Sequence, residues 1–369
     1  MANQENGNAT PMTRTLTFVN CVLALLATGC LHSGIGPRSL PVDRASYSVS
    51  LADSWKEQTL LNIVKIRYID PPIFVDIGNI VASYSLAQSA TLGGTILPKG
   101  GSNLTLGGSG TFIDSPTVTY TPLTGSAYIR GLLTPLSPTV VFSTVQNGAG
   151  TDSILLSSVA SINGLKNQQA TMNGITPADP DFHRVLSLMR QIEVSGAVRV
   201  YVKEDASHQQ SSILAVHLKD IPPDTQDAIR ELRVLLHLNP DATEFKLVYA
   251  PLPSSDTEIA VLTRSIVGLI ANLAAQVEVP PEDLVRHRAF PGFEANHDVP
   301  NIVPLIRIHS SNTKPADAFV RIYYRNTWFW IDDGDLDSKH VFAQLMQLFT
   351  MADTGAREQS LPVITIPVR

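Results

Sequence analysis

Two alternating stretches, ASYSLAQSATLGGTI at residues 82–96 and NLTLGGSGTFI at residues 103–113, decide the fold of this chain. Apolar and small polar residues take turns along both stretches, and residues 117–121 continue the pattern. Because successive residues of a β-strand belong to opposite faces, this period of two predicts strands with one apolar face. Residues 98–102, PKGGS, have the composition of a turn. The sequence therefore predicts paired strands in this region.

The same region is almost free of charge, and two interpretations fit it. Between Ile77 and Leu165 the only charged residues are Lys99, Asp114, Arg130 and Asp152. In the first interpretation the strands form a sheet that packs on a helix around Trp55 and turns a Ser/Thr/Gly face to water. In the second, residues 82–121 form a membrane hairpin with a lipid-facing apolar side, for which about 9–11 alternating residues per strand suffice. One hairpin cannot close a barrel, so the second interpretation requires a ring of subunits. Alternation does not distinguish water from lipid, and both stay open.

The segments on either side of this region predict an α+β fold. Ser54-Trp55-Lys56-Glu57 matches a capping box and opens a helix that Asp70-Pro71-Pro72 ends. We expect a β-rich domain at 51–175 with this one covering helix, and an α+β domain of strand pairs and helices at 176–369. Its predicted helices lie at 181–193, 222–238, 256–276 and 336–351, and its predicted strands at 198–202, 213–218, 245–249, 302–308, 318–324, 328–331 and 363–368. Strands are also expected at 139–145 and 153–162.

The N-terminal stretch Leu23–Cys30, LALLATGC, resembles the end of an export signal with a bacterial lipobox. Its apolar core, residues 16–27, is too short for a permanent membrane helix. The cysteines are Cys21, inside the segment to be removed, and Cys30, which then has no disulfide partner in its chain. We therefore expect a signal peptide at 1–29, lipidation of Cys30 and a tether at 30–50. Met12, which precedes Arg14, is a more typical start of a signal than Met1.

Composition excludes some classes of function. The net charge is −6 and no run of Lys and Arg occurs, so the sequence predicts no positively charged surface that would attract nucleic acid. An apolar content of 44% is typical of a folded protein. The expected partners are the membrane, reached through the N-terminal lipid, other envelope proteins and further copies of the chain.

Motifs for chemistry are weak. Asp333, Asp335 and Asp337 have the spacing that begins a calcium loop, but the later ligands are missing, which favours helix capping. His287 and His297 flank a loop with Glu294 and Asp298, without the spacing of a metal motif. Trp328-Phe329-Trp330 suits sugar stacking or, more typically, a strand that contributes alternate residues to a core. No nucleophile elbow occurs. We therefore predict no enzyme activity, no cofactor and no metal.

Several segments together resemble a family of Gram-negative bacterial envelope lipoproteins to which no activity is assigned. The resemblance lies in residues 60–68 (LLNIVKIRY) with 70–72 (DPP), 120–123 (YTPL), 161–165 (SINGL), 263–265 (TRS), 277–280 (VEVP) and 328–333 (WFWIDD). It implies a location in the cell envelope and no functional residues.

Two functions follow as hypotheses. In the first, the chain is an outer-membrane lipoprotein that faces the periplasm and is a structural or interaction component of an envelope assembly. In the second, it is a subunit of an oligomeric pore or secretion channel that uses residues 82–121 as its membrane hairpin, similar in plan to the lipoprotein channels that export curli fibres.

Overall fold

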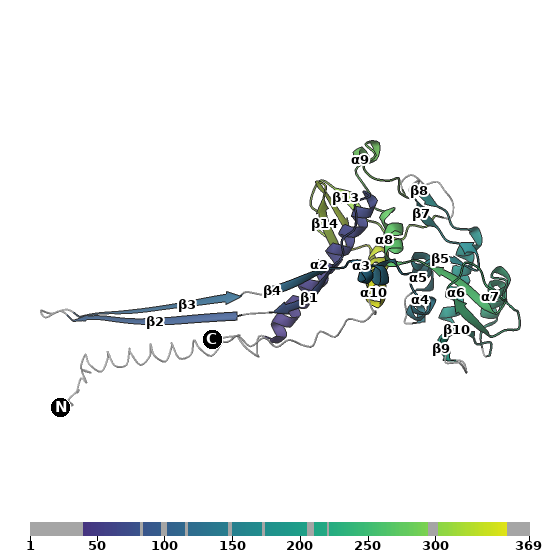
Figure 1. Cartoon of the computed structure of the whole chain (residues 1–369), viewed down its shortest axis with the longest axis horizontal. Helices are drawn as coiled ribbons and strands as arrows, with labels where there is room; N and C mark the ends of the chain where they lie inside the picture. The colour runs from purple at the N-terminus through teal and green to yellow at the C-terminus, as the bar shows by residue number, and fades with distance from the viewer. Residues whose placement is uncertain are drawn as a thin grey trace, which may run out of the picture. The chain divides into compact units, whose positions relative to one another are not determined.

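The computed structural model describes residues 40–81, 84–96, 102–114, 117–146, 150–171, 174–204, 210–219, 221–293 and 302–352. Its contacts divide the chain into unit 1, residues 1–52 and 79–118, and unit 2, residues 53–78 and 119–369. The fold class is α+β, as predicted. Helices and sheets are labelled in Figure 1.

The described helices are α2 (Leu40–Arg67), α3 (Gly125–Tyr128), η2 (Ile129–Leu133, a π-helix), α4 (Pro138–Gln146), α5 (Thr151–Ser158), α6 (Pro180–Val194), α7 (Pro223–Leu235), α8 (Ile266–Ala274), α9 (Pro281–Val285) and α10 (Leu336–Ala352). None of these helices is both long enough and apolar enough to cross a membrane.

The described strands are β1 (Val75–Val81), β2 (Tyr84–Ile96), β3 (Ser102–Asp114), β4 (Thr117–Pro122), β5 (Val159–Ile162), β6 (Leu165–Lys166), β7 (Gln169–Thr171), β8 (Gly174–Thr176), β9 (Val198–Glu204), β10 (Gln210–Val216), β11 (Glu244–Val248), β12 (Glu258–Thr263), β13 (His309–Ser311), β14 (Val320–Tyr324) and β15 (Thr327–Ile331). The paired strands predicted from the alternation are present as β2, β3 and β4.

Helix α2 begins earlier than predicted. Ser54 lies inside it, and residues 40–50, expected as part of the tether, are helical. No glycine or proline occurs from Val42 to Arg67, so nothing in the sequence interrupts the helix, and Pro41 lies in the first turn, where proline is tolerated. The helix ends before Asp70-Pro71, as predicted. Trp55, expected to support the alternating strands, packs edge-on against Phe349 of α10 with ring centroids 5.9 Å apart.

A six-stranded sheet with the order β6-β5-β12-β11-β10-β9 organises much of unit 2. Strands β11 and β12 are parallel, and the other neighbours are antiparallel. Asn163 and Gly164, both at positive φ, form the turn that joins β5 to β6. Because β5 pairs with β12, this sheet combines strands from both sides of the domain boundary expected at 175/176, and the compact units divide the chain elsewhere.

Two predicted strands, 139–145 and 153–162, are mainly helical. Pro138, Val141, Phe142 and Val145 are buried in α4. Their spacing of three and four residues gives one helical face, and short apolar runs fit a helix or a strand equally well. Residues 151–158 form α5, and only residues 159–162 form a strand.

The predicted helix 256–276 is also wrong in its first half. Residues 258–263 are β12, a central strand with both faces covered, and its run of Ile259, Ala260, Val261 and Leu262 carries no alternation for that reason. Ser265 then caps α8, because its hydroxyl accepts from the Gly268 amide at 3.1 Å.

A three-stranded antiparallel sheet, β13-β15-β14, follows in the chain. Arg325 and Asn326 join β14 to β15 at positive φ, as a two-residue hairpin turn requires, between the strands predicted at 318–324 and 328–331. In the predicted strand 302–308 only Ile308 makes a β-bridge, to Val277. The predicted strand 363–368 lies outside the described residues.

Candidate functional site

The register of β2 with β3 makes one face of this two-stranded ribbon apolar. The strands pair over thirteen positions, from Tyr84 opposite Asp114 to Ile96 opposite Ser102. Residues directly opposite in an antiparallel pair share a face. The mainly apolar face has the pairs Leu86–Phe112, Ala90–Gly108, Leu92–Leu106 and Gly94–Leu104, together with Tyr84–Asp114, Gln88–Gly110 and Ile96–Ser102. The mainly small polar face has Ala87–Thr111, Ser89–Ser109, Gly93–Thr105 and Thr95–Asn103, together with Ser85–Ile113 and Thr91–Gly107. The Ser89 and Ser109 hydroxyl oxygens lie 2.6 Å apart, as this assignment requires.

The ribbon, residues 84–96 and 102–114, pairs with no third strand among the described residues. At about 3.4 Å per residue it is roughly 44 Å long, with a row of unpaired backbone groups along each outer edge. Thr91, the segment 107–111 and Ile113 are exposed, and Ile113 exposes 51% of its surface. An isolated pair of strands is marginally stable in water. In the described part of the chain both outer edges of the ribbon are therefore open to pairing.

A cluster of tyrosines and charges ties the end of α2 to the β14–β15 turn. The Tyr324 hydroxyl donates to Asp70, which also accepts from Arg325 at 2.9 Å. These contacts hold the pKa of Asp70 below its usual value, with the Tyr324 hydrogen bond as the main cause. The Tyr68 hydroxyl donates to Asp283 at 2.8 Å, and burial with this bond raises the pKa of Tyr68 well above its usual range. With these shifts, neither the Asp70 carboxyl nor the Tyr68 hydroxyl changes its protonation near neutral pH, and their hydrogen bonds stabilise the fold.

The Asp332–Asp337 turn is a helix cap, as predicted. The Asp335 carboxylate accepts from the Ser338 amide at 3.0 Å and from its hydroxyl at 2.7 Å. Partial desolvation opposes the ionised form, but the Ser338 hydrogen bonds still lower the pKa of Asp335. Asp333 pairs with Lys339 at 2.8 Å. No group of His, Cys, Asp and Glu suited to a metal ion occurs among the described residues.

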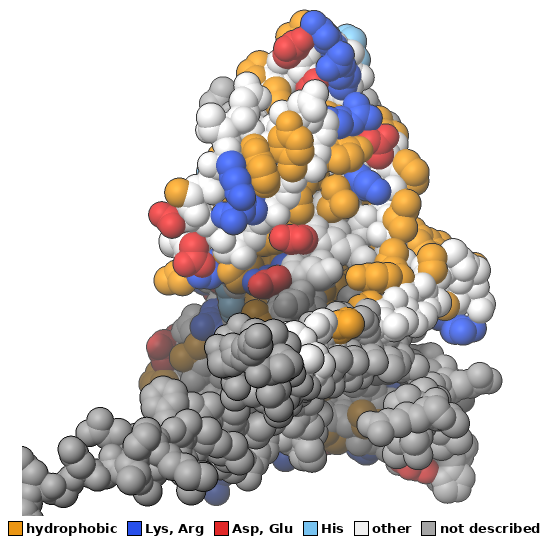
Figure 2. Space-filling model, turned by 90° about the vertical axis from the view of Figure 1, so that its left-hand side faces the viewer, with side chains coloured by type: hydrophobic (Ala, Val, Ile, Leu, Met, Phe, Trp, Pro, Cys, Tyr) orange, Lys and Arg blue, Asp and Glu red, His pale blue; other side chains and the backbone are white. Residues whose placement is uncertain are grey.

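The Trp328-Phe329-Trp330 segment lies in β15 and contributes to the core through its central residue. Phe329 is fully buried, whereas the two tryptophans are half-buried on the other face. Trp328 packs against Tyr323 with ring centroids 5.0 Å apart, and Trp330 against His309 at 5.4 Å. The core interpretation is confirmed for Phe329. On the face drawn in Figure 2, hydrophobic side chains form several groups among basic and acidic ones.

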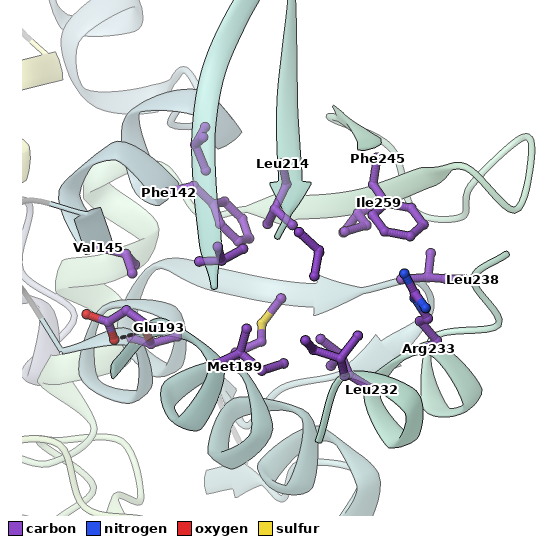
Figure 3. A pocket seen from close by; sticks show the side chains of 16 residues that line it. Phe142, Val145, Met189, Glu193, Leu214, Leu232, Arg233, Leu238, Phe245 and Ile259 are labelled. Carbon is purple, nitrogen blue, oxygen red and sulfur yellow. Dashed lines mark hydrogen bonds between the residues drawn. The ribbon is translucent and has the colours of Figure 1, made fainter. Parts of the chain in front are cut away.

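An apolar crevice lies between the six-stranded sheet and helices α4, α6 and α7 (Figure 3). Its volume is about 40 Å³, room for no more than a few water molecules. Met189 of α6 and Leu232 of α7 face Leu214, Phe245 and Ile259 of the sheet across it. Glu193 lies at one end and Arg233 at the other. The crevice was not predicted from the sequence. Arg233 comes four residues after Ile229 and therefore lies on the apolar stripe of its helix, where a charged residue is unusual.

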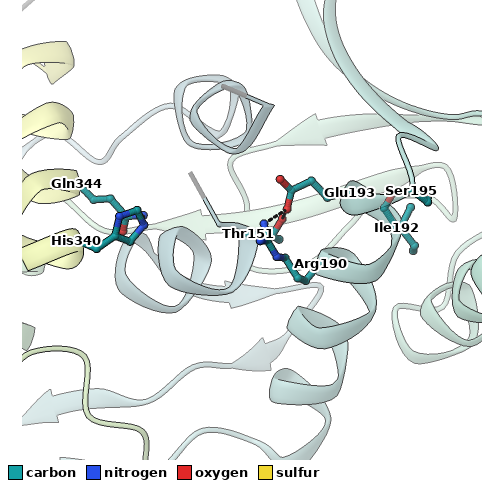
Figure 4. Close-up of polar contacts among 7 residues, drawn as sticks. All are labelled: Thr151, Arg190, Ile192, Glu193, Ser195, His340 and Gln344. Atoms are coloured by element: carbon teal, nitrogen blue, oxygen red, sulfur yellow. Dashed lines mark hydrogen bonds and ion pairs between the residues drawn. The ribbon is translucent and has the colours of Figure 1, made fainter. Parts of the chain in front are cut away.

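Figure 4 shows two sets of polar side chains in unit 2, one around Glu193 and the other around Gln344. Glu193 accepts from the Thr151 hydroxyl and from Arg190 at 2.9 Å, so its charge is paired. Ser153 donates to the Gln344 amide oxygen at 2.8 Å, and the Gln344 nitrogen lies 2.7 Å from His340 Nε2. The amide separates the hydroxyl from the imidazole, so the arrangement lacks the direct nucleophile–base contact of a hydrolase.

Other predicted residues are apart or outside the described part of the chain. Cys30, Glu294, His297 and Asp298 lie outside the described residues. His287 follows α9 at positive φ and is exposed.

Two residues in the segments that carry the family resemblance, Arg264 and Asn163, form hydrogen bonds to carbonyls far away in the chain. Arg264 is buried and donates to the carbonyls of Leu156, Ser157 and Gln168. The Asn163 side chain donates to the Leu236 carbonyl at 2.7 Å. No family model, curated protein or solved structure matches this chain.

Proposed function

We propose that this protein is a lipoprotein of the outer membrane, anchored through Cys30 and facing the periplasm, that is a structural or interaction component of an envelope assembly. The observation that carries the proposal is the β2–β3 ribbon with both outer edges unpaired among the described residues. Exposed strand edges pair with other strands by backbone hydrogen bonds. In this proposal the ribbon joins the protein to its partner, which is a second copy of the chain or another envelope protein.

Proline substitutions in β3 test the role of the ribbon. Adjacent residues of a strand direct their amides to opposite sides, so of Thr105→Pro and Leu106→Pro one removes a donor from the outer edge of β3 and the other removes a hydrogen bond between β3 and β2. We expect the unaltered full-length protein, extracted from its host membrane, to form a large particle by light scattering, and both variants to lose it. The unfolding transition of unit 2 serves as the control and should not move. A particle of unchanged size in both variants would refute the proposal.

A second candidate, a subunit of an oligomeric pore, is favoured by one further observation. The register puts Leu86, Leu92, Leu104, Leu106 and Phe112 on one face and mostly small polar residues on the other, in the alternation that a lipid-facing strand pair needs; Gln88 and Ile113 are exceptions. A ribbon of roughly 44 Å, tilted by about 40°, is long enough for an apolar band of about 25 Å. Several ribbons in a ring would be needed to close the channel.

Two neighbouring lysine substitutions separate this candidate from the first. Lysine at mid-bilayer on a lipid-facing strand position costs about 2–4 kcal/mol, whereas a lumen position tolerates it. Leu106→Lys, on the apolar face, should abolish dye release from vesicles that contain the protein. Thr105→Lys, on the small polar face, should retain release with altered ion selectivity. Vesicles that stay tight with the unaltered protein would exclude the pore and leave the assembly proposal standing.

A further inference from the structure

The three-stranded sheet β13-β15-β14, whose outer strands are labelled in Figure 1, has one buried face and one face accessible to solvent. Phe329 and Ile322 lie opposite each other and are buried, so the alternate residues of the three strands form the accessible face. These residues form two rows across the sheet, His309–Trp330–Arg321 and Ser311–Trp328–Tyr323. Three of the six are large aromatic residues, the other three carry hydrogen-bonding side chains, and none is aliphatic.

The aromatic side chains of this face keep surface that a ligand can contact. Tyr323 is 56% exposed, and Trp328 and Trp330 are half-buried. The Tyr323 and Trp328 rings lie side by side, with their planes inclined by 46°. A sugar ring has C–H groups on its faces and hydroxyl groups around its rim, so it fits aromatic rings that have hydrogen-bonding neighbours. The fold thus adds Tyr323 to the two tryptophans for which sugar stacking was considered from the sequence.

Two cations border the aromatic rings and form no ion pair with a carboxylate in the described part of the chain. The Lys314 ammonium lies over the Trp328 ring, 5.5 Å from its centroid, and Arg321 donates to a backbone carbonyl of the same loop at 3.3 Å. The β13 edge of the sheet is acidic, because the Glu278 carboxylate lies 3.1 Å from His309 Nδ1. An anionic group is therefore attracted to the side of Lys314 and Arg321 and repelled from the side of Glu278.

We propose that this face binds an acidic glycan, a sugar chain with carboxylate groups. One sugar ring would stack on Tyr323 and Trp328, and its carboxylate would accept from Lys314 or Arg321. Charged donors form stronger hydrogen bonds with carboxylates than neutral donors do. The two rows hold no aliphatic side chain, which favours a glycan over an apolar protein segment, and the net charge of −6 disfavours nucleic acid. This inference does not depend on the proposed function.

Isothermal titration calorimetry of the full-length protein in lipid nanodiscs tests the proposal with three probes. A mannuronate hexamer is an acidic glycan, cellohexaose is a neutral glycan, and hexaglutamate is an acidic peptide without sugar rings. We expect the mannuronate hexamer to bind saturably to the protein and not to empty nanodiscs. Cellohexaose should bind at least roughly ten-fold more weakly, because it lacks the carboxylates. Hexaglutamate should not bind, because it offers no ring to the aromatic side chains.

Substitutions then test whether the probe binds at this face. Tyr323→Ala removes an exposed ring and should weaken binding of the mannuronate hexamer roughly five-fold or more, as expected for a lost aromatic contact. Tyr249→Ala removes a tyrosine that is 50% exposed after β11, and this matched control should leave the affinity within about two-fold. Arg321→Gln combined with Lys314→Gln should reduce the affinity for the mannuronate hexamer to that for cellohexaose.

The comparison of the three probes uses the unaltered protein, so it stays decisive if a variant fails to fold. Absence of saturable binding of the mannuronate hexamer, equal affinities for the acidic and the neutral glycan, or binding of hexaglutamate would overturn the inference. An unchanged affinity in folded Tyr323→Ala protein would also overturn it, because the probe would then bind elsewhere.

Discussion

Gly292 illustrates at the scale of one residue how a buried charge restricts its neighbours. Arg67 is fully buried and lies 4.9 Å from the centroid of the Phe290 ring. A Cβ atom on Gly292 would overlap the Arg67 guanidinium and the Ala275 carbonyl oxygen. We predict that Gly292→Ala lowers the free energy of unfolding by about 1–3 kcal/mol, measured by urea denaturation. Gly131→Ala, where the added atom meets nothing within 4 Å, should be near neutral. Equal stabilities of the two variants would contradict this account.

Asp70 gives a prediction for acid stability. Its pKa is lowered in the folded state, mainly by the Tyr324 hydrogen bond, so its contribution is present above the unfolded pKa of about 3.9. The contribution is lost as the pH falls from there through the lower folded pKa. Asp70→Asn should therefore cost about 1 kcal/mol at pH 7 and less at pH 2, measured by denaturant unfolding at both pH values. Asp317→Asn, at an exposed loop position, serves as the control. A cost that persists unchanged at pH 2 would show that the ionised carboxylate is not the cause.

Single residues could be predicted where their role is local. The Asp335 cap and the Arg325-Asn326 turn follow from short motifs, because cap and turn contacts lie within a few residues. Arg67 and Arg264 owe their roles to a ring and to carbonyls far along the chain. Nothing beside them in the sequence shows that they are buried.

Elements could be predicted where only one periodicity fits. The ribbon alternates over long stretches, and α6 repeats every three to four residues, so both were recognised. The run in β12 is apolar on both faces, and the run in α4 is short, so periodicity could not separate helix from strand. The pairing of β12 with β5 and β11 is what shows that residues 258–263 form a strand.

Hydrogen exchange tests whether the ribbon requires a partner. A lone strand pair opens readily, whereas β12 lies inside a six-stranded sheet. In protein dispersed as a monomer, the amides of β2 and β3 should exchange at least about 100-fold faster than those of β12. In the assembled particle the same amides should become protected. Slow exchange of the ribbon in the monomer would mean that it is stable alone, and the main argument for an assembly role would fail.

At the scale of the whole molecule, the proposed attachment to a bilayer rests on Cys30. In a mature lipoprotein two or more acyl chains anchor stably, whereas one chain binds weakly. We predict that protein from its own host begins at Cys30 and carries acyl chains, as seen by intact mass spectrometry. Cys30→Ser should leave the protein in the soluble fraction, with the unfolding transition of unit 2 unchanged. Cys21→Ser is the matched control and should stay in the membrane, because that residue lies in the segment expected to be removed. If the Cys30→Ser protein still sediments with membranes, the ribbon would be its membrane contact. That result would favour the pore proposal over attachment through the lipid alone. A mature terminus elsewhere with no acyl chains would remove the proposed location and the assembly role drawn from it.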